Sequence, residues 1–128
     1  METERFIEIG ETQRWRLDTP IQIYVRDDSP HLAGHSRDIS LYGIQIELGI
    51  DLALDSIVKL EIYFQRNNVL DFIAQEPLQI KAQVIWRKPI TSAGYESWEI
   101  GLQFVNISEE QQDIIQTEVA VDTENSEE

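Results

Sequence analysis

Apolar and polar residues alternate along five stretches of the chain. Residues 21–25 (IQIYV), 44–48 (IQIEL) and 57–64 (IVKLEIYF) each place apolar side chains on one side of an extended backbone. Residues 78–86 and 98–104 repeat this period of two. Such alternation is typical of strands with one buried face. The pattern therefore predicts an all-β barrel or sandwich with short loops.

The strand pattern of the last two stretches is interrupted, at 87–89 and at Gly101. The run Arg87-Lys88-Pro89 is predicted to end the first, because proline cannot donate to a strand ladder. Gly101 lies opposite the apolar face of the second, where a bulge or a close backbone approach is expected. A short further strand is predicted over 69–74, and 27–34 reads as a loop around Pro30. The predicted inward residues are Leu78, Ile80, Ala82, Val84 and Trp86, then Trp98, Ile100, Leu102 and Phe104.

The two ends of the chain differ from this strand-rich middle. Residues 1–13 show no clear period and are predicted to be a mobile arm. Ser108 and Gln111 form a capping-box pattern, which predicts a helix that covers or plugs one end of the barrel. Residues 122–128 are polar and acidic and are predicted to be disordered. One domain over 14–121 is expected, and the apolar stripe of its helix is Ile114, Ile115 and Val119.

Composition narrows the class of protein. A chain of 128 residues suits a single domain. The formal net charge of −14 argues against unspecific binding to DNA, RNA or an anionic membrane, since these need a cationic surface. Eight of the 24 acidic residues lie from Glu109 onward, where no basic residue occurs, so a local anion site remains open earlier in the chain. With no cysteine and no membrane-length apolar stretch, a cytoplasmic protein is expected.

The segment 37–43 (RDISLYG) lies between two apolar runs and contains several residues that could bind a ligand. The Asp38 carboxylate can accept paired hydrogen bonds from a planar edge such as that of guanine. Ser40 can donate or accept nearby, and Gly43 allows positive φ or close backbone approach. Asp and Ser also bond their own backbone in tight turns, so a purely structural turn is the alternative interpretation.

Two arginines flank a tryptophan earlier in the chain. In an extended backbone, Arg14 and Arg16 lie on one side and Trp15 on the other. The guanidinium groups are then placed to hold phosphate oxygens. Alternatively, Trp15 anchors the arm to the barrel while both arginines stay in solvent.

Catalysis and metal binding are disfavoured. His31 and His35 have a spacing that suits a metal on a helix, but Pro30 and Gly34 argue against a helix and no third ligand is indicated. Both histidines fall near one loop and cysteine is absent, so a nucleophile with its base is hard to assemble. Neither an enzyme nor a metal site is predicted.

The ordered set of motifs resembles the PilZ domain family. Asp38, Ser40 and Gly43 keep the spacing D-x-S-x-x-G after an arginine-bearing segment, and 84–86 (VIW) and 101–104 (GLQF) follow in order. The resemblance covers about residues 12 to 115. It implies a six-stranded antiparallel β-barrel with a C-terminal helix, which in many relatives binds the bacterial second messenger cyclic di-GMP.

Members of the family bind this ligand through an R-x-x-x-R segment and the D-x-S-x-x-G corner. Arg16 corresponds to the second arginine, whereas Thr12 stands in place of the first, and Arg14 is the available substitute. Arg37 neighbours Asp38 and points oppositely in a regular strand, so it joins the site only from the rim. Trp86 either stacks on a base or belongs to the core.

Two functions follow from the resemblance. In the first, the chain senses cyclic di-GMP between the arginine segment and the Asp38 corner and relays binding to an effector protein of motility, pilus assembly or polysaccharide export. In the second, it is an adaptor that has lost the nucleotide and acts through protein contacts. The altered arginine motif and the acidic C-terminal segment motivate the second.

Overall fold

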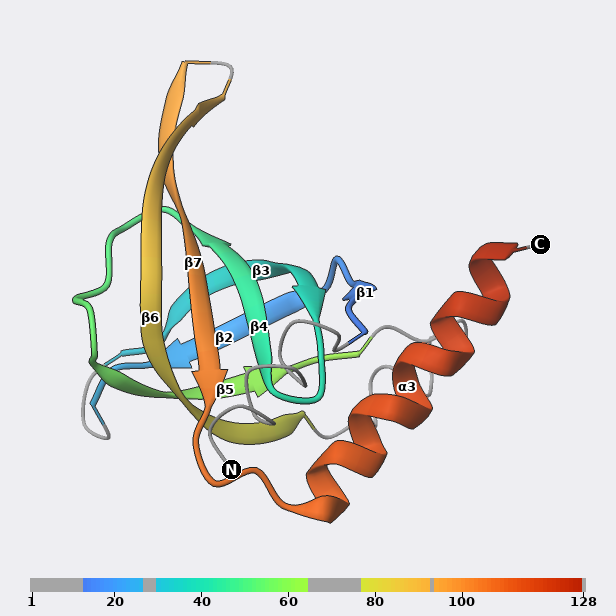
Figure 1. The fold of residues 1–128 in the computed structure, drawn as a ribbon. Coiled ribbons are helices and arrows are strands. Elements are labelled where there is room, and N and C mark those ends of the chain that lie inside the picture. The colour runs from blue at the N-terminus through green and yellow to red at the C-terminus, as the bar shows by residue number, and fades with distance from the viewer. Residues whose placement is uncertain (1–12, 27–29, 65–76, 93, 128) are drawn as a thin grey trace, which may run out of the picture.

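The structure is a computed structural model that describes residues 13–26, 30–64, 77–92 and 94–127 (Figure 1). The described residues form seven strands and one helix. Most of the predicted arm and the strand predicted over 69–74 lie outside these ranges. The elements are β1 (Trp15–Arg16), β2 (Pro20–Tyr24), β3 (Leu32–Ile39), β4 (Gly43–Leu48), β5 (Ile57–Ile62), β6 (Leu78–Ser92), β7 (Tyr95–Phe104) and α3 (Glu109–Glu127).

The sheet closes into a barrel. Its strand order is β1-β3-β2-β5-β6-β7-β4, and a further pairing between β3 and β4 joins the ends. Every pairing is antiparallel. Six strands, β2 to β7, make the closed ring, which confirms the predicted architecture. β1 pairs with the end of β3 that β2 leaves free, and this places Arg16 opposite Asp38.

The barrel interior holds the predicted apolar faces, except for Trp86 and Trp98. Closure removes free edges and lets each strand bury one face, which is why the period-two pattern was a good guide. Trp98 is only half-buried against this core. The fully buried large side chains include Ile21, Ile23, Ile39, Ile44, Ile46, Leu60, Ile62, Ile100, Leu102 and Ile115.

A buried serine bridges the gap between β1 and β2. The Ser36 hydroxyl donates to the carbonyl of Leu17 and accepts from the Thr19 amide at 3.1 Å. Its side chain is 1% exposed. The hydroxyl therefore satisfies two buried backbone groups that the strand break would leave without partners.

The predicted loop over 27–34 is wrong in its last part. Leu32, Ala33 and Gly34 belong to β3, because β2 pairs with one side of this segment and β4 with Gly34 on the other. A methyl group on Gly34 would lie 2.6 Å from the Glu47 carbonyl oxygen. The glycine here reflects close strand packing and not a turn.

The predicted end of β6 at Arg87-Lys88-Pro89 is also wrong. β6 and β7 continue as a paired hairpin that projects from the barrel, visible at the top of Figure 1. Pro89 lies where β6 pairs with β7 alone, since β5 pairs only with residues up to Gln83. One edge of β6 is free there, so the missing amide is tolerated.

Helix α3 begins with the predicted capping box. The Gln111 amide donates to the Ser108 hydroxyl (3.1 Å), and the Ser108 amide donates to the Gln111 side chain (2.9 Å). Ile115 and Val119 are buried against the barrel core, as predicted. Ile114 is 37% exposed, so its assignment to the apolar stripe is wrong, because it lies about 100° around the helix from Ile115.

The C-terminal part of α3 also differs from expectation. Helical backbone continues to Glu127, into the segment 122–128 for which disorder was predicted. Extending a helix by one residue is far less costly than starting one, so a capped and docked first half favours continuation.

Candidate functional site

A bulge in β3 shapes the outer face of the barrel around Asp38. The pairing with β4 runs Ser36 to Ile46 and then Asp38 to Gln45, which leaves Arg37 as an extra residue. Ser36 is buried, whereas Arg37 and Asp38 both lie outside. The expectation that Arg37 points away from Asp38 and reaches the site only from the rim is therefore wrong. A bulge turns consecutive side chains to one face, which regular alternation forbids.

Asp38 belongs to a row of outward residues that crosses five strands. Arg16 pairs with Asp38, Asp38 with Gln45, Gln45 with Gly101, and Gly101 with Trp86. Facing residues in an antiparallel sheet share one face. The row therefore links the arginine segment, the Asp38 corner and the tryptophan.

Trp86 lies on this outer face because of a second bulge. Val84 pairs with Leu102 and Trp86 with Gly101, so Ile85 is the extra residue. The core interpretation of Trp86, including its place in the inward set, is wrong. The half-buried indole covers Gly101, where a methyl group would lie 2.8 Å from Trp86 Cδ1 and closer still to Nε1 and Cε2. The glycine thus provides the space in which the indole lies.

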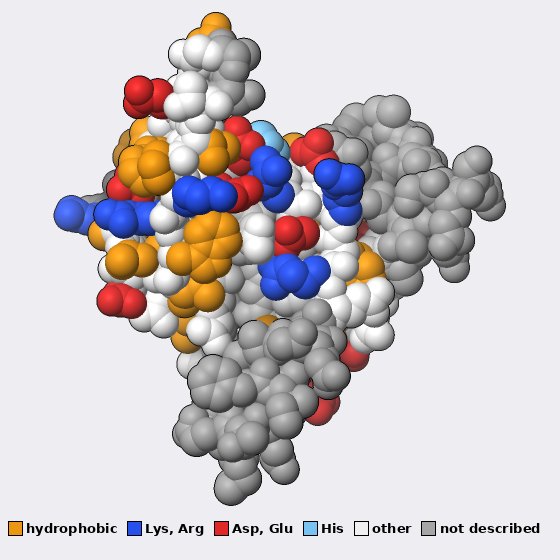
Figure 2. Space-filling model, turned by 45° about the horizontal axis from the view of Figure 1, so that its top comes forward, with side chains coloured by type: hydrophobic (Ala, Val, Ile, Leu, Met, Phe, Trp, Pro, Cys, Tyr) orange, Lys and Arg blue, Asp and Glu red, His pale blue; other side chains and the backbone are white. Residues whose placement is uncertain are grey.

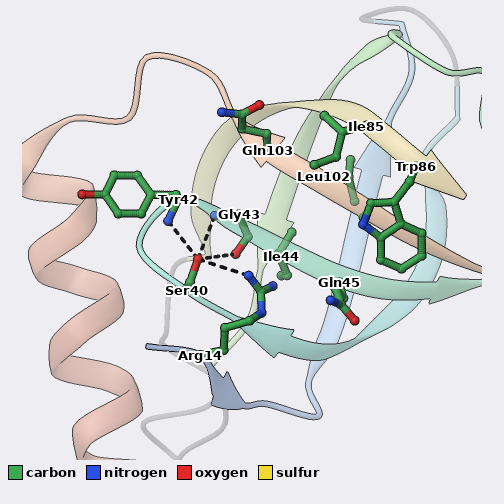
Figure 3. A pocket seen from close by; sticks show the side chains of 11 residues that line it. Arg14, Ser40, Tyr42, Gly43, Ile44, Gln45, Ile85, Trp86, Leu102 and Gln103 are labelled. Atoms are coloured by element: carbon green, nitrogen blue, oxygen red, sulfur yellow. Dashed lines mark hydrogen bonds between the residues drawn. The ribbon is translucent and has the colours of Figure 1, made fainter. Parts of the chain in front are cut away.

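Ser40, two residues after Asp38, is tightly bonded (Figure 3). The Ser40 hydroxyl accepts from the amides of Tyr42 (3.1 Å) and Gly43 (3.2 Å), so Ser40 forms the turn foreseen as the structural alternative. Arg14 Nε donates to Asp38 Oδ1 at 2.6 Å, and Arg14 Nη1 lies 3.5 Å from Ser40 Oγ. Arg14 therefore contacts both Asp38 and Ser40.

Gly43 is required by close packing. A methyl group there would lie 2.5 Å from the Leu102 carbonyl oxygen, in the neighbouring strand β7. Of the two reasons foreseen for this glycine, close approach holds, while the positive φ angles among the described residues occur at Asp55, Gly94 and Asn106.

Two adjoining hollows lie along this face and share Arg14. The larger is a cleft of about 660 Å³ lined by Arg14, Arg16, Asp18, His35, Ser36, Arg37 and Asp38. The smaller, of about 150 Å³, runs from Arg14 and Ser40 past Gln45 to Ile85 and Trp86. Basic and acidic side chains intermingle over the face shown in Figure 2. Three arginines against two aspartates give the larger cleft a formal excess of one positive charge on a chain of charge −14.

The arginines of the cleft differ in their partners. Arg37 is held by Glu47 at 3.1 Å and by Glu99 at 2.8 Å, on β4 and β7. Arg14 pairs with Asp38, whereas Arg16 makes no ion pair with any other described residue. Arg16 is thus the guanidinium most available to an incoming anion.

Several residues of this face were not among the predicted site residues, His35, Gln45 and Ile85 among them. His35 was expected only to lie near a loop, yet it is part of β3 and lines the larger cleft. Gln45 and Ile85 line the smaller hollow. The outward position of Gln45 can be predicted from the alternation of 44–48, but no sequence signal marks the bulge at Ile85, or the bulge at Arg37 that turns Asp38 to the face of His35.

Two tyrosines with altered pKa values, Tyr24 and Tyr63, do not line either hollow. Burial, and then the nearby Glu61 carboxylate, raise the pKa of Tyr24 and Tyr63, so both phenols stay protonated at neutral pH.

Within the described ranges, no three His, Cys, Asp or Glu side chains are grouped as metal ligands. Nor does any helix of the described chain have the length and apolarity to cross a membrane.

A known protein family matches most of the chain, including the residues of the candidate site. The PilZ domain family matches residues 11–120. The chain belongs to the PilZ domain family. This match spans the arginine segment, both bulges and the first half of α3. No curated protein sequence matches the chain.

Solved PilZ structures share the fold at low sequence identity. The PilZ domain of YcgR from Escherichia coli, solved with c-di-GMP, has 15% identity and a TM-score of 0.69, with 91% of this chain and 94% of that one covered. The Bacillus subtilis inhibitor of motility MotI/DgrA has 16% identity and a TM-score of 0.65, covering 90% and 51%. Borreliella burgdorferi PlzA, solved in complex with c-di-GMP, has 10% identity and a TM-score of 0.64, covering 98% and 57%. The last two matches span only about half of the longer proteins.

Proposed function

We propose that this PilZ domain is a receptor for cyclic di-GMP, which binds across the row from Arg16 to Trp86. The observation that carries the proposal is the juxtaposition of Asp38, two arginines and an outward tryptophan on one face. The two solved relatives described with c-di-GMP support the choice of ligand.

Each part of the ligand has a matching group. Guanine presents adjacent N–H donors on one edge, and the Asp38 carboxylate can accept both. Arg16 and Arg14 supply the fork-like donors that suit phosphate oxygens. Trp86, at the other end of the row, offers an aromatic face for a base. Ser40 and Gly43 hold the corner itself, while Arg37 lines the cleft and is held there by two carboxylates.

Arg14 compensates for the threonine at position 12. Its guanidinium already reaches the corner, 2.6 Å from Asp38 Oδ1 and 3.5 Å from Ser40 Oγ. Guanine binding requires Arg14 to share the carboxylate or to turn toward a phosphate. Either movement changes how Arg14 lies against the corner, and we infer that this change is what an effector protein recognises.

Single substitutions test the site. Asp38→Ala and Arg16→Ala each remove a charged hydrogen bond worth about 1.5–3 kcal/mol, so each is expected to weaken binding about tenfold to a hundredfold. Arg87→Ala is the matched control, because Arg87 pairs with Asp51 at 2.9 Å and does not line either hollow. Calorimetric titration measures the three affinities, and thermal melting checks that each variant is folded.

The outcomes separate receptor from adaptor. Equal affinity of wild type, Asp38→Ala and Arg16→Ala contradicts the proposed site. Absence of binding in wild type, together with a protein partner captured equally well with and without nucleotide, identifies the adaptor instead.

A further inference from the structure

The larger cleft holds one group that the proposed contacts do not use. His35 faces outward from β3, because it pairs with Glu47 on β4 and Glu47 is on the outer face. It lines the cleft with Arg14, Arg16 and Asp38. Its side chain is 49% exposed, so a ligand in the cleft can reach it.

The partners of His35 leave its ring accessible. Its Nε2 lies 3.6 Å from Glu47 Oε1, which is too long for a hydrogen bond. The same oxygen already accepts from Arg37 at 3.1 Å, and Glu47 Oε2 accepts from Ser97 at 3.1 Å. Glu47 is thus largely satisfied without the histidine.

We propose that His35 is a further ligand-binding residue, which donates from its protonated ring to a phosphate of the dinucleotide. This inference rests on the proposed function. A protonated imidazole adds one positive charge to a cleft that has a formal excess of one. Histidine is the side chain that ordinarily changes charge between about pH 5 and 8, so binding is coupled to proton uptake.

The charges around His35 favour this role. Arg14, Arg16 and Arg37 line the same cleft, and a bound phosphate offsets their repulsion of a second cation. The acidic groups nearby are already paired: Asp38 with Arg14, and Glu47 with Arg37. Further charged groups on this side are Asp18, Glu99 and Lys88, of which Glu99 pairs with Arg37 and Lys88.

The chain supplies its own control. His31 is the other histidine of the chain. It does not line either hollow, and its ring centroid lies 5.7 Å from that of Tyr24. His31→Gln therefore removes an imidazole that does not line the proposed site. His35→Gln removes the proposed contact, and His35→Lys makes its charge permanent.

The test is titration of the full chain with cyclic di-GMP at about pH 5.5 and about pH 8. Wild type and His31→Gln are expected to bind about tenfold more tightly at the lower pH, His35→Gln equally at both, and His35→Lys tightly at both. Titrations near pH 6.5 in buffers of different ionisation enthalpy are expected to show proton uptake in wild type and none in His35→Gln.

The results separate this inference from the proposed function. Wild-type binding without pH dependence, or a dependence that persists in His35→Gln, overturns the role of His35 and leaves the receptor standing. Absence of binding at both pH values overturns the receptor and the histidine contact together.

Discussion

The space above Gly101 gives the sharpest test of how a base is held. Gly101→Ala places a methyl group within 2.8 Å of Trp86 Cδ1 and nearer still to two other indole atoms. Such separations are well inside van der Waals contact, so the indole must leave the row. The colliding atoms belong to an exposed-face side chain and not to backbone, so the barrel itself need not move.

The expected loss is that of one stacking contact. Base–aromatic stacking is worth about 1–3 kcal/mol, so Gly101→Ala is expected to weaken binding of cyclic di-GMP about fivefold to 150-fold. Stability changes by no more than about 1 kcal/mol, because alanine lowers the entropy of the unfolded chain while the half-buried indole loses some packing.

Two comparisons make this prediction specific. Gly49→Ala is the control, since a methyl group there meets nothing within 4 Å. Trp86→Ala is expected to weaken binding as much as Gly101→Ala, and the double variant no more than either, since both act through one contact. The assay is calorimetric titration, with urea unfolding for stability. Unchanged affinity in Gly101→Ala and Trp86→Ala refutes a stacking role for the indole.

Two further predictions concern the scaffold. Ser36→Ala leaves the Leu17 carbonyl and the Thr19 amide without their partner and is expected to lower the free energy of unfolding by about 1–3 kcal/mol, measured with urea; a loss below about 0.5 kcal/mol contradicts the bridging role. Ile115→Ala is expected to cost about 2–5 kcal/mol, whereas the neighbouring Ile114→Ala stays within about 0.5 kcal/mol, and equal losses contradict the observed helix face.

Several strands of the barrel could be predicted from the alternation of apolar and polar residues. The segments 21–25, 44–48 and 57–64 became β2, β4 and β5 because closure buries one face of each strand, which is the condition that alternation reports. The helix start was readable because Ser108 and Gln111 satisfy each other's amides locally. Both signals depend on near neighbours alone.

The errors arise where tertiary pairing overrides the local pattern. An extra residue at Arg37 and another at Ile85 each shift the alternation by one, which turned Arg37 and Trp86 to the face opposite the one predicted. Pro89 looked like a strand end, but a free edge accommodates it. The bulges that build the candidate site are thus the features that single-sequence periodicity could not reveal.

The candidate site was predictable in part from the motif and not from geometry. Asp38, Ser40 and Gly43 identified the corner, and the structure adds that Arg14 contacts it. The inclusion of His35 required the outer face of β3 to be known. Residues that share a ligand through bulges have no fixed sequence spacing, so only the fold brings them together.

The receptor proposal is tested most directly by calorimetric titration of the full chain with cyclic di-GMP at about 150 mM salt, where long-range repulsion by the acidic chain is screened. Cyclic di-AMP is the matched control ligand, because adenine does not present guanine's paired donors to Asp38. Saturable binding of cyclic di-GMP is expected with a Kd in the low micromolar range or tighter, about −8 kcal/mol, together with much weaker binding of cyclic di-AMP. No heat with cyclic di-GMP and no competition by it, or equal affinity for both nucleotides, contradicts the account.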